Sequence, residues 1–267
     1  MITLDDIAIC ISNGPNSYKI TEVFLQSYCE HLNELTKNLN IYIHCDGPDN
    51  KNDYLITDII KMCKLINKKY KTNIKCTKVK ESKNHGTGLD DFMNTIVKEN
   101  NYKWVVFLHS DMLVHGENWF DEMRDLIMKE DYSLICKVLN PTIRTNQISE
   151  HSNTYLQSTI YTAFFAVCVK DFFEVNGTFQ GSYIGRNNNT DWNYRYQVEF
   201  PNNYIGLDTG SMLLFLFLVN HKYIYYYNFK ENKHIEHIFS RYKDAAETEE
   251  LKKNTKFFRR LKEEFND

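Results

Sequence analysis

The sequence predicts an α/β fold with a mainly parallel central sheet flanked by helices. Over roughly the first 110 residues, short apolar runs typical of buried strands alternate with longer stretches of helical spacing. A strand–helix–strand succession of this kind builds a parallel sheet with helices on both faces. The first two strand-like runs also end in turn residues, Ser12-Asn13-Gly14-Pro15 and Asp46-Gly47-Pro48-Asp49.

The first half of the chain supplies the parallel part of this sheet. Strands are expected at Ile7–Ser12, Asn40–Cys45, Asn73–Val79 and Lys103–His109. Three of these runs are apolar, whereas the run at 73–79 alternates apolar and polar residues. Between the strands, apolar residues recur at helical spacing and predict helices at Thr21–Leu35, Tyr54–Tyr70 and Gly88–Glu99.

The second half is mixed. Apolar runs there predict strands at Ser133–Leu139, Tyr161–Lys170 and Tyr223–Tyr227. Helical spacing predicts helices at Glu117–Lys129, Asp208–Asn220 and Thr248–Phe265, of which the last is charged and amphipathic. A chain of 267 residues fits one large domain, and we expect residues 1–267 to form a single one.

Composition narrows the class of protein. The formal net charge of −3 argues against a general nucleic-acid binder. The seven cysteines form no CxxC pair, and several lie in apolar runs, so reduced core residues are expected instead of disulfides or a zinc site. No basic signal segment precedes Asp5 and Asp6, and the most apolar run, Met212–Val219, is too short to span a bilayer. We therefore expect a cytoplasmic protein without a transmembrane segment.

The most informative stretch is Val105–Met112. Its apolar run ends abruptly at His109-Ser110-Asp111, which indicates a buried strand that carries an imidazole and a carboxylate at its carboxyl end. Open α/β sheets bind ligands at these strand ends. A carboxylate there suits a divalent cation that carries a diphosphate. The alternative is that Asp111 only caps or turns the chain.

Other strand ends and loops carry polar groups that are expected to meet at the same edge of the sheet. A nucleotide needs a carboxylate for its base or ribose, glycines for close backbone approach and a metal for its phosphates. The segments that offer such groups are Ser12-Asn13, Asp46-Gly47, Asn84-His85-Gly86-Thr87-Gly88 and His109-Ser110-Asp111. Asp46-Gly47-Pro48 taken alone is also consistent with a simple turn.

The run from Asn84 to Met112 consists of an NxGxG loop, a helix and a strand that ends in an acidic residue. This run resembles nucleotide-sugar glycosyltransferases of the A-type fold, and most of all inverting family two. The resemblance implies the nucleotide-diphospho-sugar transferase fold and a DxD motif that holds Mn²⁺ or Mg²⁺ on the donor diphosphate. Asp111 matches the last Asp of that motif, and His109 stands at its first position. The implied nucleotide-sugar-binding residues are Ser12, Asn13, Asp46, Asn84, Gly88, His109, Ser110 and Asp111.

The second half resembles the acceptor side of the same family. The resemblance implies an acceptor-side Asp before a helix, matched by Asp208, and a later metal-binding His, matched by His237 or, alternatively, His234. Residues three apart on a strand face opposite sides, so at most one of these histidines should bind the metal. Asp208 is the candidate general base and Asp191 its rival. Asp208 could instead be only a helix N-cap, and Asp191 only a loop residue.

The function expected from the sequence is therefore metal-dependent transfer of a sugar from a nucleoside diphosphate sugar to a glycan or other hydroxyl acceptor, with inversion. Residues 1–112 would form the nucleotide-binding half, residues 113–240 the acceptor-binding half and residues 241–267 a C-terminal helix. Two alternatives stay open. One is a nucleotidyltransferase, although Ser12-Asn13-Gly14-Pro15-Asn16 lacks the basic glycine-rich loop expected there. The other is a non-catalytic relative that binds a nucleotide sugar or a glycan.

Overall fold

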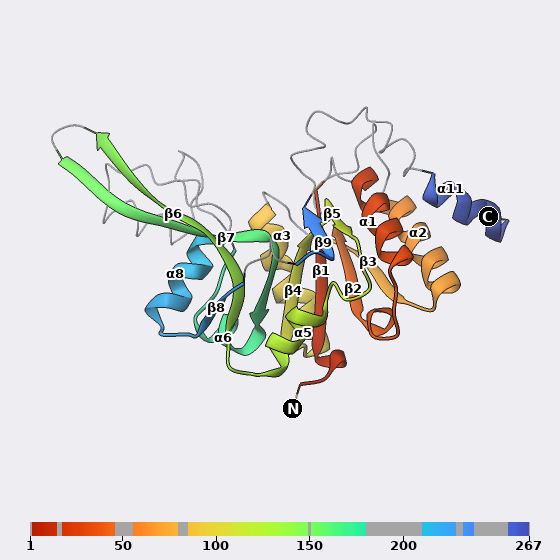
Figure 1. The fold of residues 1–267 in the computed structure, drawn as a ribbon, viewed down its shortest axis with the longest axis horizontal. Coiled ribbons are helices and arrows are strands. Elements are labelled where there is room, and N and C mark those ends of the chain that lie inside the picture. The colour runs from red at the N-terminus through yellow and green to blue at the C-terminus, as the bar shows by residue number, and fades with distance from the viewer. Residues whose placement is uncertain are drawn as a thin grey trace.

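A computed structural model describes residues 2–14, 18–45, 56–79, 85–148, 151–179, 210–227, 232–237 and 256–266. Its main feature is a seven-stranded sheet in the order β3-β2-β1-β4-β7-β6-β8 (Figure 1). The strands are β1 Ile7–Asn13, β2 Asn40–Cys45, β3 Asn73–Lys78, β4 Trp104–His109, β6 Leu134–Ile148, β7 His151–Cys168 and β8 Ile224–Tyr226. Strands β1 to β4 are parallel, and β7 alone of these seven runs in the opposite direction. The predicted mainly parallel sheet is confirmed.

Helices cover both faces of this sheet. The longer ones are α1 Tyr18–Glu30, α2 Ile56–Tyr70, α3 His85–Phe92, α5 Asp121–Met128, α8 Ser211–Val219 and α11 Phe257–Phe265. Alternate residues of the central strand β1 serve the two faces, as the pleat of a strand requires. Ile7, Ile9 and Ile11 lie in the core with α1, α2, α5 and α11, whereas Ala8 and Cys10 lie in the core with α3 and α8.

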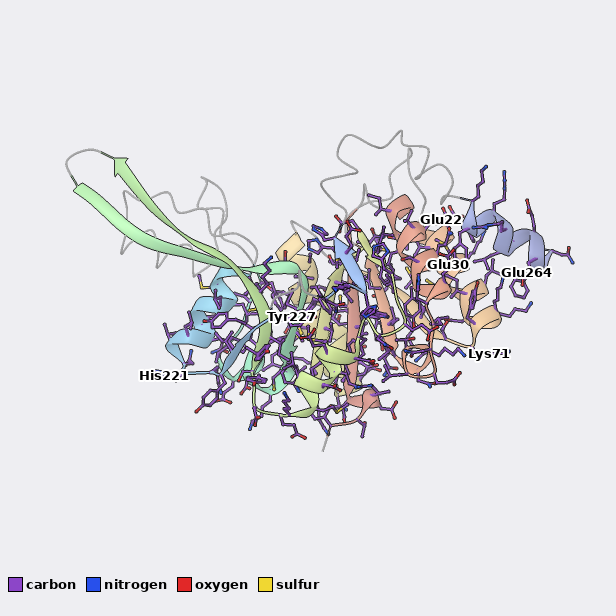
Figure 2. All side chains as sticks on the ribbon, in the orientation of Figure 1. Glu22, Glu30, Lys71, His221, Tyr227 and Glu264 are labelled. Atoms are coloured by element: carbon purple, nitrogen blue, oxygen red, sulfur yellow. The ribbon has the colours of Figure 1, made fainter. Side chains whose placement is uncertain are left out.

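The C-terminal helix α11 is fixed to the body of the protein by a buried carboxylate. Glu22 on α1 accepts a hydrogen bond from the backbone N–H of Phe258 at 2.7 Å, and Figure 2 shows Glu22 beside α11. This N–H belongs to the first turn of the helix, where backbone donors have no partner within the helix. Phe257, Phe258 and Leu261 are buried against the core, so the predicted amphipathic helix is confirmed over residues 257–265.

Several predicted boundaries are corrected. The strands expected at Ser133–Leu139 and Tyr161–Lys170 are much longer, because β6 and β7 pair with each other in a hairpin that extends away from the sheet (Figure 1). The pairing continues through polar residues since backbone groups alone sustain it. The expected strand end at Lys170 is instead helical, in α6 Val169–Glu174.

Predicted helix bounds also differ from the structure, and α5 spans Asp121–Met128 instead of Glu117–Lys129. Helix α1 spans Tyr18–Glu30 instead of Thr21–Leu35. Beyond it the chain turns, because Asn33 and Thr36 bond each other's backbone N–H groups at 2.9 and 2.8 Å. The helix expected at Gly88–Glu99 starts at His85 and contains a π-helical stretch, Met93–Val97, followed by α4 Lys98–Asn100. No helix within the described ranges is long and apolar enough to cross a membrane.

Candidate metal and nucleotide site

The site lies at the carboxyl end of β4. Residues 104–108 are buried in the core, and Ser110 and Asp111 directly after the strand are buried as well. The backbone N–H of Ser110 donates to the carbonyl of Ser12 at 3.1 Å, and Ser12 pairs with His109 in the parallel register of β1 and β4. The ends of the two central strands therefore meet, as the sequence pattern predicts.

A second, two-stranded sheet brings His237 to this edge. Strand β5, Met112–Val114, pairs antiparallel with β9, Ile235–His237, so that His237 lies opposite Met112 and next to Asp111. Strand β5 is anchored on α1, because the Val114 backbone N–H donates to Ser27 Oγ at 3.1 Å. Neither short strand is predictable from hydropathy, because three residues carry too little periodicity to be recognised.

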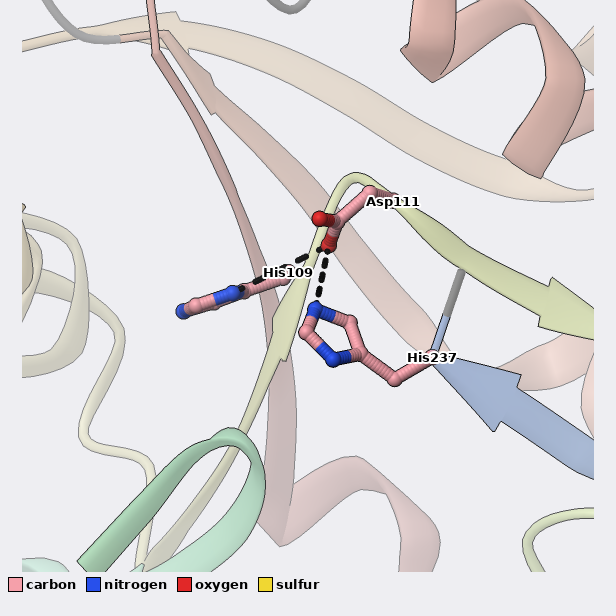
Figure 3. A group of neighbouring side chains, drawn as sticks. All are labelled: His109, Asp111 and His237. Carbon is pink, nitrogen blue, oxygen red and sulfur yellow. Dashed lines mark ion pairs between the residues drawn. The ribbon is translucent and has the colours of Figure 1, made fainter. Parts of the chain in front are cut away.

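His109, Asp111 and His237 form one group (Figure 3). Asp111 Oδ1 lies 3.1 Å from Nε2 of His237 and 3.8 Å from Nδ1 of His109. The two imidazole rings are inclined at 68° with centroids 5.7 Å apart, and Figure 3 shows both of them directed at the same Asp111 oxygen. One potential ligand atom from each residue lies within 4.8 Å of the other two.

These residues fit a divalent metal ion. Two ligand atoms about 2.1 Å from one ion, at right angles to each other, lie about 3 Å apart, close to the separation of the Asp111 and His237 atoms. Asp111 Oδ1 is buried, and the imidazole nitrogens of His237 and His109 lie beside it without a hydrogen bond of good geometry. A buried carboxylate requires a positive partner, which a metal ion held between these three groups would supply. No other described His, Cys, Asp or Glu belongs to such a group.

His234, the alternative metal histidine, lies outside this group. It is exposed at the start of the β9 segment, and its carbonyl accepts a hydrogen bond from the backbone N–H of His115 at 2.8 Å. Its own backbone N–H donates to Asn232 Oδ1 at 3.0 Å. These bonds fix the turn that leads into β9, so His234 helps to position the strand that carries His237.

The ends of β1 and β2 lie beside the metal group. Asn13 is buried, and its Nδ2 contacts Cys45 Sγ at 3.7 Å across the strand pair while its Oδ1 accepts no hydrogen bond. Ser12 lies between His109 on β4 and His44 on β2 in the register of the sheet. A polar row therefore crosses the carboxyl edge of the sheet from β2 to β4.

His44 is the member of this row that the sequence analysis missed. Burial lowers the pKa of His44 to about 4, against the opposing effects of Asp91 and the Gly88 backbone, so the ring is neutral near pH 7. Nδ1 of His44 lies 2.8 Å from Thr77 Oγ1 on β3, and Nε2 lies 3.4 Å from Asp91 Oδ2. Its position one residue before the end of an apolar strand, in NIYIHC, is the signal that could have identified it.

The buried Gly88 is on α3, the helix that carries Asp91. Four other predicted site residues lie outside the described residues: Asp46, Asn84, Asp191 and Asp208. The helix that was expected to begin at Asp208 begins at Ser211, with Gly210 as its N-cap at a φ of +86°. The predicted helix is confirmed over residues 211–219, and it starts three residues later than expected.

No family model matches the sequence, and no curated protein matches it. Among solved structures, the glycosyltransferase GlyE of Streptococcus pneumoniae TIGR4 superposes with a TM-score of 0.52 at 13% identity, over 97% of this chain and 63% of GlyE. This chain thus spans somewhat less than two thirds of GlyE.

Two further structures are less similar. Mouse xyloside xylosyltransferase 1 has a TM-score of 0.47 at 7% identity, over 83% of this chain and 84% of that one. The 4-diphosphocytidyl-2C-methyl-D-erythritol synthase of Anaerococcus prevotii DSM 20548 has a TM-score of 0.41 at 13% identity, over 82% of this chain and 98% of that one. At such identities the likeness concerns the fold alone. The topology and the superposition on GlyE together show that this chain has the nucleotide-diphospho-sugar transferase fold.

Proposed function

We propose that this protein is a metal-dependent glycosyltransferase that moves a sugar from a nucleoside diphosphate sugar to a hydroxyl acceptor, with inversion. The observation that carries the proposal is the group of His109, Asp111 and His237 at the carboxyl edge of the sheet. In open α/β sheets this edge is where ligands bind. GlyE, whose fold this chain shares, is a glycosyltransferase, which supports the same class of reaction.

Asp111 and His237 would hold the metal, with His109 beside them. When bound, the metal would neutralise charge on the diphosphate leaving group. Asp111 supplies the one carboxylate of the group, and its burial at 6% exposure keeps it from being screened by water. His237 is carried by β9, so pairing of β9 with β5 assembles the site.

The donor would lie across the ends of β1, β2 and β4. Ser12 and Asn13 line this edge, and Asp46 follows the last residue of β2 in the sequence. We place the base and ribose here, because hydrogen-bonding groups and a carboxylate are what a nucleoside requires. Asn84, Gly88 and Ser110 complete the proposed donor site.

An inverting transfer needs a base that removes the proton of the acceptor hydroxyl while the opposite face of the sugar is attacked. Asp208 is the proposed base and Asp191 its rival. Asp208 precedes α8 by three residues, counting from Ser211.

The proposal also includes the single-domain organisation, membership of inverting family two and a cytoplasmic location.

The proposal is tested by a thermal-shift screen of nucleoside diphosphate sugars with and without Mn²⁺. A ligand at a hundredfold excess over its dissociation constant stabilises a protein by about 2.7 kcal/mol. Stabilisers are then assayed for release of free nucleoside diphosphate. Metal-dependent release supports a glycosyltransferase, whereas formation of pyrophosphate with a nucleoside triphosphate and a sugar phosphate identifies a nucleotidyltransferase. Binding without any release under all acceptor conditions contradicts catalysis and identifies a non-catalytic relative.

A further inference from the structure

A strongly basic surface lies at the β3 end of the sheet, where α2 and α11 are neighbours (Figure 1). The two helices are in contact, because Lys69 of α2 forms an ion pair with Glu264 of α11. We propose that the exposed face of these two helices, the α2–α11 basic surface, binds a bilayer that contains anionic lipids. The proposal goes beyond the sugar transfer proposed above and does not depend on it.

Cations outnumber carboxylates in the two segments that form this surface. The basic residues of segments 56–71 and 256–265 are Lys61, Lys64, Lys68, Lys69, Lys71, Lys256, Arg259, Arg260 and Lys262. The acidic residues are Asp58, Glu263 and Glu264, and the last two are paired with Arg259 and Lys69. Because the whole chain has a formal net charge of −3, this positive surplus is local and the rest of the chain is acidic. Such asymmetry indicates an anionic partner.

Helical spacing gathers these cations on adjoining faces. Residues three or four apart lie in line on a helix, and Lys61, Lys64 and Lys68 follow this spacing along the exposed face of α2. On α11, Lys256 and Arg260 lie in line with Glu264, the residue that contacts α2. The two rows of cations therefore run along neighbouring faces of the pair of helices.

Several of these cations are available to an outside partner. Lys61, Lys64, Lys256 and Arg260 are exposed, and none of the four forms an ion pair with a carboxylate of the described residues. The apolar face of α11 is packed on the core through Phe257, Phe258 and Leu261. Contact with a bilayer would therefore be electrostatic and would not require the helix to unpack and insert.

The chemistry of the surface favours lipid headgroups over nucleic acid. A cluster of lysines and arginines on an amphipathic helix is typical of proteins that bind anionic lipids. Single-stranded nucleic acids also need exposed aromatic rings on which bases can stack. The aromatic rings here, Phe265 and Tyr70, are only partly exposed, and Nζ of Lys68 and of Lys69 lie 4.3 and 5.3 Å from their centres. A ring covered by a lysine offers no stacking face, whereas both groups suit the interface of a bilayer.

The test is flotation of the full chain with vesicles of two compositions. One is phosphatidylcholine alone, and the other contains about one third phosphatidylglycerol. Each is measured at about 0.1 M and about 0.5 M NaCl, since salt screens attraction between exposed charges. A DNA duplex is tested separately as the alternative partner.

Two triple variants remove the same amount of charge. The surface variant is Lys61→Gln with Lys64→Gln and Arg260→Gln. The matched control is Lys98→Gln with Lys129→Gln and Lys170→Gln, at exposed lysines on neither α2 nor α11. Glutamine keeps the helix propensity of these positions, and thermal unfolding checks that both variants fold.

We expect the wild type to bind the anionic vesicles at least about tenfold more tightly than the neutral ones, and to be released at the higher salt. Each cation near an anionic bilayer contributes about fivefold, so the surface variant should lose about a hundredfold and the control much less. Equal binding to both vesicle compositions overturns the proposal, and so do equal losses in the two variants. Binding of the duplex without binding to anionic vesicles overturns it in favour of a nucleic-acid partner. The comparison of compositions requires no variant to fold.

Discussion

His44 makes the stability of this protein depend on pH in a defined way. Burial lowers the pKa of His44 to about 4, whereas a histidine in an unfolded chain titrates near pH 6.5. When the pKa of a histidine is lower in the folded state than in the unfolded state, folding is not penalised at pH values above the unfolded-state pKa. At those pH values the residue is neutral in both states. As the pH falls below about 6.5, only the unfolded chain takes up the proton, so stability is lost until about pH 4.

The magnitude follows from the separation of the two pKa values. Each unit of difference corresponds to 1.36 kcal/mol, so the loss between pH 6.5 and 4 is on the order of 3 kcal/mol. The assay is urea unfolding between pH 7.5 and 4 for the wild type and for His44→Gln, which keeps a polar group near Thr77 but does not titrate.

Between pH 6.5 and 4, the free energy of unfolding should fall by about 3 kcal/mol less in His44→Gln than in the wild type. This difference is expected whatever the stability of the variant at pH 7.5. His115→Gln, at a ring that is 44% exposed, is the control for replacing a histidine outside the core. If the wild type and His44→Gln lose stability in parallel between pH 6.5 and 4, the reasoning on His44 is refuted.

Three further predictions concern the donor site, the base and the C-terminal helix. Asp46→Ala should raise the KM for the nucleotide sugar more than it lowers kcat, and unchanged nucleotide affinity by calorimetry would count against it. Asp208→Asn should slow transfer by about a hundredfold or more while sparing donor and metal binding, and an inactive Asp191→Asn beside an active Asp208→Asn would reverse the two roles. Leu261→Ala, which empties a buried position of α11, should cost about 2 to 5 kcal/mol in urea unfolding. The exposed Arg259→Ala should cost about 0.5 kcal/mol or less, and equal losses in both variants would contradict the packing of α11.

The parallel half of the fold could be predicted because its strands are buried on both faces. The runs at Ile7, Asn40 and Trp104 are nearly continuous in apolar residues, and such runs stand out in a sequence. Their polar ends followed from the same pattern, so Ser12, Asn13 and Asp111 could be placed at one edge of the sheet. The structure places all three there.

The β6–β7 hairpin could not be predicted from hydrophobic pattern. Its strands pair through backbone groups from Thr142 to Ile148 with Gln157 to His151, and that pairing demands no apolar face. The polar stretch between the two predicted strands therefore gave no periodic signal. The extent of such a hairpin depends on register, which a short pattern does not encode.

The assembly of the metal group depends on contacts between residues far apart in the sequence. Strand β9 is three residues long, and only its pairing with β5 brings His237 to Asp111. His237 was named as a candidate because of a family resemblance, and its hydropathy pattern alone could not have indicated it. His44 was missed for the opposite reason, since an isolated histidine within an apolar strand resembles an ordinary core residue.

The most direct test of the proposed function compares the wild type with Asp111→Asn in the presence of Mn²⁺. The substrate is the sugar nucleotide that the thermal-shift screen identifies, and the measured quantity is the release of nucleoside diphosphate. The variant should fold, because Asn fills the same space and keeps a side-chain oxygen beside His237. Asp125→Asn, at a carboxylate that is 62% exposed on α5, is the control. We expect full release by the wild type and by Asp125→Asn, and none above background by a folded Asp111→Asn. Release at the wild-type rate by folded Asp111→Asn would contradict the proposed function.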